Sequence, residues 1–68
     1  MTSFPNIQTV EDALARSDRY AGRYRGAWYQ IELKPSGFFF ARINGQNSAV
    51  RDNLRDVLDA VYQKIERG

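Results

Sequence analysis

The sequence predicts a small α+β domain in which a helix, an antiparallel β-hairpin and a long amphipathic helix follow one another. Three patterns predict this class. Residues 27–43 contain two runs of alternating apolar and polar side chains separated by a Pro-Ser-Gly turn, which is typical of a hairpin. Residues 50–65 repeat apolar side chains at helical spacing, and a weaker helical pattern precedes the hairpin. A chain of 68 residues is expected to form one domain, 1–68, with the second helix packed on one sheet face.

The first helix is predicted to follow an irregular lead-in at residues 1–8. Thr9 has a side chain suited to an N-cap, and two acidic residues follow it where the helix dipole favours anions. We expect a helix over about Val10–Asp18, extending toward Ala21 if Gly22 ends it as a left-handed cap.

The predicted hairpin joins a strand at Ala27–Leu33 to a returning strand at Phe38–Ile43. A three-residue loop at 35–37 places Leu33 opposite Phe39 and leaves one sheet face uniformly apolar. A two- or four-residue loop would instead set glutamine and glutamate beside apolar partners, so the three-residue loop is favoured. The apolar face then consists of Tyr29, Ile31, Leu33, Phe39, Ala41 and Ile43.

The segment just before this hairpin, Arg23–Gly26, permits two interpretations. It forms either a third, edge strand of the sheet or an irregular approach to the first strand of the hairpin. Gly26 suggests a bulge or a bend at this point.

The second helix is predicted over about Ala49–Glu66, after a turn at residues 44–47. Asn47 or Ser48 is the expected N-cap. One face of this helix is apolar, and the charges on its other face cancel. The apolar positions are Val50, Leu54, Val57, Leu58, Val61 and Ile65. The predicted core consists of these residues and of Val10, Leu14, Tyr29, Ile31, Leu33, Phe39 and Ile43.

The composition argues against an enzyme. The chain contains no Cys and no His, which excludes disulfides, thiolate or imidazole metal sites, and Ser–His or Cys–His catalysis. Three carboxylates, Asp52, Asp56 and Asp59, lie close together on the predicted second helix and are interpreted as a solvated face among arginines. We therefore expect no catalytic residue, no metal, no cofactor and no small-molecule substrate.

The second face of the predicted hairpin is more informative. In the favoured register it presents three large aromatic side chains, Trp28, Phe38 and Phe40, beside Arg42. Aromatic residues and arginine are enriched at interaction hot spots, so this face is predicted to bind a partner or a second copy of the chain. The alternative is that the first helix or residues Phe4–Ile7 fold over this face and make it part of the core.

A second candidate site is the arginine–tyrosine segment at 16–29. Four arginines and one aspartate lie between residues 16 and 25. Within it, Arg23, Tyr24 and Arg25 combine positive charge with an aromatic ring, a pattern that can follow a phosphate backbone and stack bases. The alternative is that the tyrosines of this segment pack in the core while the arginines remain solvated.

Two functions are consistent with these features. The first is a non-catalytic protein-binding module, an adaptor or inhibitor that covers a partner surface, as small phage-encoded inhibitors of host complexes do. The second is a nucleic-acid-binding protein that uses segment 16–29 and the aromatic face. A net charge of only +2 favours the protein partner. No signal-like or membrane-spanning stretch is visible, so we expect a cytoplasmic protein without membrane contact.

Overall fold

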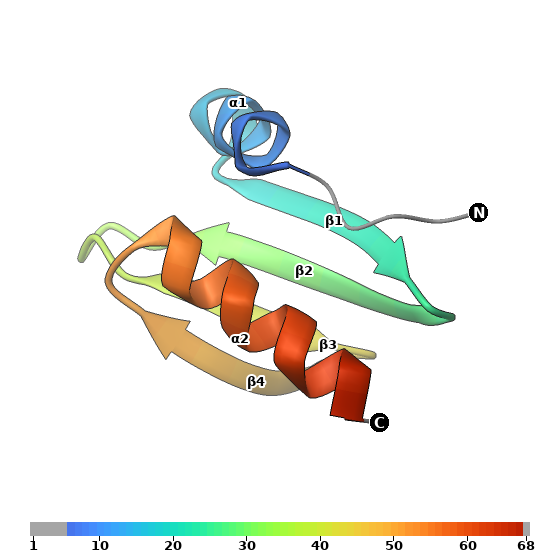
Figure 1. The fold of residues 1–68 in the computed structure, drawn as a ribbon. Coiled ribbons are helices and arrows are strands. Elements are labelled where there is room, and N and C mark those ends of the chain that lie inside the picture. Colours follow the sequence, from blue (N-terminus) through green and yellow to red (C-terminus); the bar gives the residue numbers. More distant parts are fainter. Residues whose placement is uncertain (1–5, 68) are drawn as a thin grey trace.

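Along the chain, an N-terminal helix is followed by four strands and a C-terminal helix, and the strands form one antiparallel sheet (Figure 1). This confirms the predicted α+β class. The computed structural model describes residues 6–67. Its elements are α1 (Ile7–Ser17), β1 (Arg19–Tyr24), β2 (Ala27–Leu33), β3 (Phe39–Ile43), β4 (Gln46–Arg51) and α2 (Leu54–Arg67). The strands lie side by side in chain order, so β1 and β4 are the two edges of the sheet.

The central hairpin, β2–β3, has the predicted register. Leu33 pairs with Phe39, and Ile31 pairs with Ala41. The backbone N–H of Lys34 donates to the carbonyl oxygen of Phe38 over 3.0 Å, which closes the expected three-residue loop. Gly37 adopts φ +93°, a left-handed conformation that glycine reaches without steric cost. Loop chemistry and hydrophobic pattern therefore specify the same pairing.

Of the two interpretations of the segment before the hairpin, the edge strand is correct, and this strand is β1. It runs over Arg19–Tyr24 and pairs with β2 without a register shift. Gly26 forms no bulge. It makes a two-residue hairpin turn with Arg25, both with positive φ, 52° for Arg25 and 80° for Gly26.

The predicted start of the first helix is wrong, and so is its extension toward Ala21, whereas its end lies one residue before the predicted Asp18. The helix begins at Ile7, where Asn6 is the N-cap and its Oδ1 accepts from the Thr9 backbone N–H over 2.9 Å. It ends at Ser17 because Asp18 takes the left-handed position, with φ 61°, and donates its N–H to the Leu14 carbonyl. The predicted irregular lead-in is therefore wrong from Ile7 onward, and its first five residues lie outside the described residues.

Gly22 is not a helix cap but a residue of β1, outside the left-handed region. A Cβ atom at this position would lie 2.8 Å from the Tyr29 hydroxyl oxygen and 2.9 Å from Tyr29 Cζ. Real Cβ atoms essentially never approach a neighbour so closely. The absence of a side chain at Gly22 thus makes room for the tip of a core tyrosine.

The predicted start of the second helix is also wrong, because the chain forms β4 over Gln46–Arg51 before α2 begins at Leu54. Asn44 and Gly45 have positive φ, 52° and 84°, and turn β3 directly back into β4. The expected N-cap residues, 47 and 48, lie in this strand. The cap is Asn53, whose Oδ1 accepts from the Asp56 N–H over 2.9 Å.

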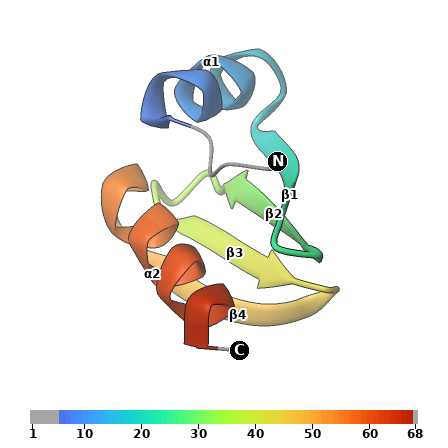
Figure 2. The same ribbon diagram turned by 45° about the vertical axis from the view of Figure 1, so that its right-hand side comes forward.

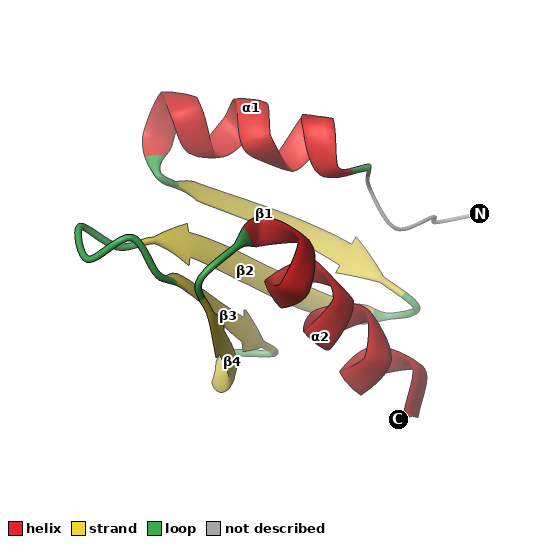
Figure 3. Ribbon diagram, turned by 60° about the vertical axis from the view of Figure 1, so that its left-hand side comes forward, coloured by secondary structure: helices red, strands yellow, loops and turns green. Residues whose placement is uncertain are grey.

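Both helices pack on the same face of the sheet, and the core lies between them and the strands. Helix α2 crosses β3 and β4 (Figure 2), whereas α1 runs beside β1 (Figure 3). The buried side chains are Val10, Leu14, Tyr24, Tyr29, Ile31, Ala41, Leu54, Val57, Leu58 and Val61. Tyr24 and Ala41 are additions to the predicted core.

Val50 is the one predicted core residue that lies elsewhere. It is 46% exposed because it belongs to β4 and not to a helix. Leu33, Phe39, Ile43 and Ile65 are half-buried at the margin of the core. Over the part of the chain that the structure describes, no helix is long and apolar enough to cross a membrane.

Candidate functional site

The sheet face opposite the helices is the candidate site. Residues paired across antiparallel strands point to the same side, so the register defines this face row by row. One row is Arg23 with Trp28, and the next contains Ala21, Gln30, Arg42 and Asn47. The third row is Arg19, Glu32, Phe40 and Val50. Lys34 and Phe38 extend this alternation beyond the strand ends. These twelve residues are called the open face below.

The open face exposes large apolar side chains. Trp28 is 41% exposed, Phe38 44% and Phe40 37%, and β4 adds Val50 to them. The alternative in which the first helix covers this face is wrong, because α1 contributes its buried residues to the opposite face. Ile7 packs against the core, and residues 4 and 5 lie outside the described residues.

Three of the exposed apolar residues form a cluster, and Trp28 lies apart from it. Phe40 and Val50 are direct partners across β3 and β4, and Phe38 lies two residues before Phe40 on the same face. We call these three residues the Phe40 cluster. Trp28 is four positions along β2 from Glu32, the residue that pairs with Phe40, which is about 13 Å at the usual rise of a strand. Trp28 thus shares a face with the Phe40 cluster but lies apart from it.

Positive charge surrounds the Phe40 cluster and Trp28. Four cationic side chains lie on the open face with a single carboxylate, Glu32. That carboxylate lies 3.1 Å from Lys34 Nζ. The hydrogen bond from Lys34 lowers the pKa of Glu32 below its usual value, and the charges of Arg42 and Arg19 lower it further. The Lys34 ammonium also lies 5.5 Å from the centroid of the Phe40 ring.

Five of the seven predicted contact residues meet on this face: Trp28, Phe38, Phe40, Arg42 and Arg23. Arg23 pairs directly with Trp28, and the two line a shallow hollow of about 330 Å³ with Ala21 and Gly22. The aromatic face and part of the arginine–tyrosine segment, two separate features in the sequence, are therefore one surface in the fold.

The other two predicted contact residues, Tyr24 and Arg25, lie away from the open face. Tyr24 is 8% exposed on the helix-covered side, with its ring 5.5 Å from that of Tyr62. Its hydroxyl donates to Glu66 over 2.5 Å, and Arg25 pairs with the same carboxylate over 3.2 Å. The hydrogen bond to Glu66, followed by burial, raises the pKa of Tyr24 to about 12. These residues join the β1–β2 turn to the end of α2.

Sequence reasoning did not assign Arg19 or Val50 to this face. Arg19 pairs with Glu32 and lies at the start of β1. The period-two series 19, 21 and 23 would have placed it, had the strand been extended that far. Val50 was assigned to a helix, although the Asn44-Gly45 pair is a hairpin signal that predicts a further strand.

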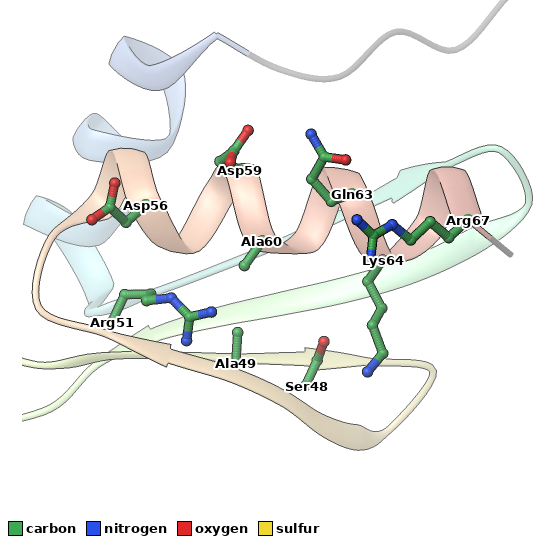
Figure 4. Close-up of a pocket in the computed structure, with 9 residues that line it drawn as sticks. All are labelled: Ser48, Ala49, Arg51, Asp56, Asp59, Ala60, Gln63, Lys64 and Arg67. Atoms are coloured by element: carbon green, nitrogen blue, oxygen red, sulfur yellow. The ribbon is translucent and has the colours of Figure 1, made fainter.

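A groove of about 700 Å³ lies between β4 and α2 (Figure 4). Its walls mix three cationic and two acidic side chains, and Lys64 extends from α2 toward β4. A hollow of about 530 Å³ continues from it and shares Ser48 and Lys64. The Ser48 hydroxyl is buried and has no hydrogen-bond partner among the described residues. Asp52 does not line the groove, and residues 6–67 contain no group of three carboxylates placed to hold a metal.

Comparison of the chain with models of known protein families, with curated protein sequences and with solved structures finds no match.

Proposed function

We propose that the protein is a non-catalytic protein-binding module, an adaptor or inhibitor that covers a partner surface with its open face. The main supporting observation is the Phe40 cluster: Phe38, Phe40 and Val50 are 37–46% exposed on a domain with 4773 Å² of accessible surface. Contiguous exposed apolar side chains on a small protein are typical of an interaction surface.

The surroundings of the Phe40 cluster fit this role. Desolvation of its aromatic rings would supply most of the affinity, as at interaction hot spots. Charged and polar side chains, Arg19, Glu32 and Lys34 among them, border the cluster and would form the rim of the interface. The strands hold most of these positions, and a backbone hydrogen bond joins Lys34 to Phe38 just beyond the strand ends. Little ordering entropy would therefore be lost on binding.

The test is a double substitution within the Phe40 cluster. The double variant Phe38→Ser and Phe40→Ser should retain a cooperative melt and lose its partner, because both side chains lie outside the core. Partners are captured from nuclease-treated extracts of the source organism and quantified by mass spectrometry against the unmodified protein. The matched control is Gln63→Ser on the exposed part of α2, which should capture the same partner.

Two results would contradict the proposal. If the double variant captures the same partner in the same amount, the open face is not the binding surface. If it unfolds, the two phenylalanines stabilise the fold and their exposure does not mark an interface.

A second candidate function is nucleic-acid binding, favoured by the pairing of Arg23 with Trp28 beside a shallow hollow. An aromatic ring next to a cation can stack a base while the cation meets a phosphate. Binding of this kind weakens with salt, and Arg23→Ala should flatten the log–log salt slope on single strands by about 0.7 if this arginine contacts one phosphate. Titration of a single-stranded oligonucleotide at several salt concentrations measures that slope.

A further inference from the structure

The arginines of the open face lack acidic partners among the residues that the structure describes. Among the described residues Arg19, Arg23 and Arg42 form no ion pair, and Arg42 Nε donates only to the amide oxygen of Asn47, over 3.3 Å. The single carboxylate of this face is already paired with Lys34. The open face therefore has an excess of three positive charges, whereas the whole chain has a net charge of +2.

We propose that the open face binds an acidic protein surface, in which carboxylates surround an apolar centre that covers the Phe40 cluster. This inference rests on the proposed protein-binding function and specifies the chemistry of the partner. Arginine suits the role because its planar fork binds a carboxylate through two parallel hydrogen bonds. Arg19 lies in the row of Phe40, while Arg42 and Arg23 lie toward Trp28, so the partner needs carboxylates on two sides of its apolar centre.

Charge disfavours a second copy of the chain as the occupant. Two open faces meeting each other would bring six unpaired arginines together, and like charges across an interface weaken association. Nucleic acid is disfavoured because the Phe40 cluster contains Val50, which offers no ring for stacking, and because Glu32 lies next to Phe40. An acidic, partly apolar protein surface is the occupant that complements both the charge and the apolar area.

The test uses Trp28, the one tryptophan of the chain, as a fluorescent reporter located on the open face. Three synthetic peptides share the same leucine and phenylalanine positions and differ only in having glutamate, glutamine or lysine at all others. A single-stranded oligothymidine is the fourth probe. We expect saturable binding of the glutamate peptide, weaker binding of the glutamine peptide and none of the lysine peptide, with affinity for the glutamate peptide falling as salt rises.

Substitutions of single arginines then show which charges contribute to binding of the glutamate peptide. Arg19→Gln and Arg42→Gln should each weaken binding of the glutamate peptide about two- to fivefold, the range for a solvent-exposed ion pair. Arg55→Gln, on the exposed part of α2, removes one positive charge elsewhere and is the matched control. It should leave the affinity unchanged apart from a small effect of net charge.

Each other outcome overturns the inference in a recognisable way. Equal binding of the glutamate and glutamine peptides, or no binding of either, overturns the acidic partner but not the proposed function, which has its own capture test. Tighter binding of oligothymidine than of the glutamate peptide, lost in Arg23→Ala, overturns both and supports the nucleic-acid alternative. A dimer in sedimentation experiments that dissociates in Phe40→Ser assigns the open face to a second copy and overturns the acidic partner.

Discussion

Gly22 is a position where one added methyl group is expected to disturb the core. Its Cβ would approach the tip of the Tyr29 side chain to 2.8 Å, and Tyr29 is fully buried. Gly22→Ala should therefore lower the free energy of unfolding by about 1–3 kcal/mol, the usual cost of overpacking. This loss should exceed the gain of about 0.5–1 kcal/mol that alanine normally brings over glycine within a strand. Urea unfolding followed by Trp28 fluorescence measures the difference.

The Tyr29→Phe background is the control for this explanation. It removes the hydroxyl group that lies closest to the added methyl group, so Gly22→Ala should cost less there than in the unmodified protein. An equal cost in both backgrounds, or a stabilising effect of Gly22→Ala, would show that contact with the ring tip is not the cause.

The raised pKa of Tyr24 predicts that the protein loses stability at alkaline pH. In the unfolded chain its hydroxyl ionises near the usual pKa of 10.0, whereas the folded protein raises this pKa to about 12. The folded state thus favours the protonated tyrosine. Its contribution is fully present below pH 10 and is lost as the pH rises toward 12. Burial also raises the pKa of Tyr29, which adds a loss in the same direction.

Tyr24→Phe isolates this contribution. The variant should have a lower melting temperature near neutral pH, because it loses the hydrogen bond to Glu66. Its stability should then fall less steeply than that of the unmodified protein above about pH 10, while the part due to Tyr29 remains. Parallel pH profiles of the two proteins would refute this assignment.

At the scale of elements, the start of α2 depends on Asn53. Its side chain accepts from the Asp56 N–H over 2.9 Å, and its carbonyl oxygen accepts from the Val57 N–H. Asn53→Ala should lower the free energy of unfolding by about 1 kcal/mol, the typical cost of a lost N-cap. Ser48→Ala is the contrast. The Ser48 hydroxyl is buried without a partner, so its removal should be neutral or stabilising.

Equilibrium unfolding of both variants in urea distinguishes the two positions. A loss of stability in Ser48→Ala but not in Asn53→Ala would contradict the assignment of Asn53 as the N-cap of α2. Ser48 lies in the edge strand β4, which pairs with β3 only. Neither substitution removes a backbone hydrogen bond of this strand, so the comparison reports on the two side chains.

At the scale of the whole molecule, the core lies on one side of the sheet only. Ile31 is fully buried under the helices, whereas Phe38 is 44% exposed on the open face. Ile31→Val, which removes one methyl group, should cost about 0.5–1.5 kcal/mol. Phe38→Ser removes far more apolar volume but should change the free energy of unfolding by less than about 0.5 kcal/mol. A larger loss for Phe38→Ser than for Ile31→Val would show that the open face contributes to the core.

Much of this fold was predictable from local patterns. The β2–β3 hairpin and its register followed from alternation on either side of the Pro35–Gly37 loop, because a shift of one residue would have placed Glu32 in the core. The apolar face of α2 from Leu54 onward followed from helical spacing. The face that presents Trp28, Phe38 and Phe40 followed from the same register.

The first turn of the predicted second helix was wrong for a reason that belongs to the whole fold. Val50 and Leu54 are four residues apart, so they match a helical stripe. In the structure, however, Val50 belongs to β4 and Leu54 is the first residue of α2. Residues 46–51 form a strand because they pair with β3. The spacing of apolar residues within 46–51 cannot reveal this pairing, since the partner lies in another segment. Tertiary context overrides helical spacing in this way when a hairpin turn supplies a ready partner.

The sequence by itself determined which residues form the central hairpin and which of its faces is apolar, because both depend on neighbours close in the chain. Only the tertiary structure decided that β1 and β4 flank this hairpin, that Tyr24 turns into the core, and that Arg19 and Arg23 join the aromatic residues. Those placements depend on pairing between strands, which local periodicity does not encode. The same pairing converts two sequence features into one cationic, partly apolar surface.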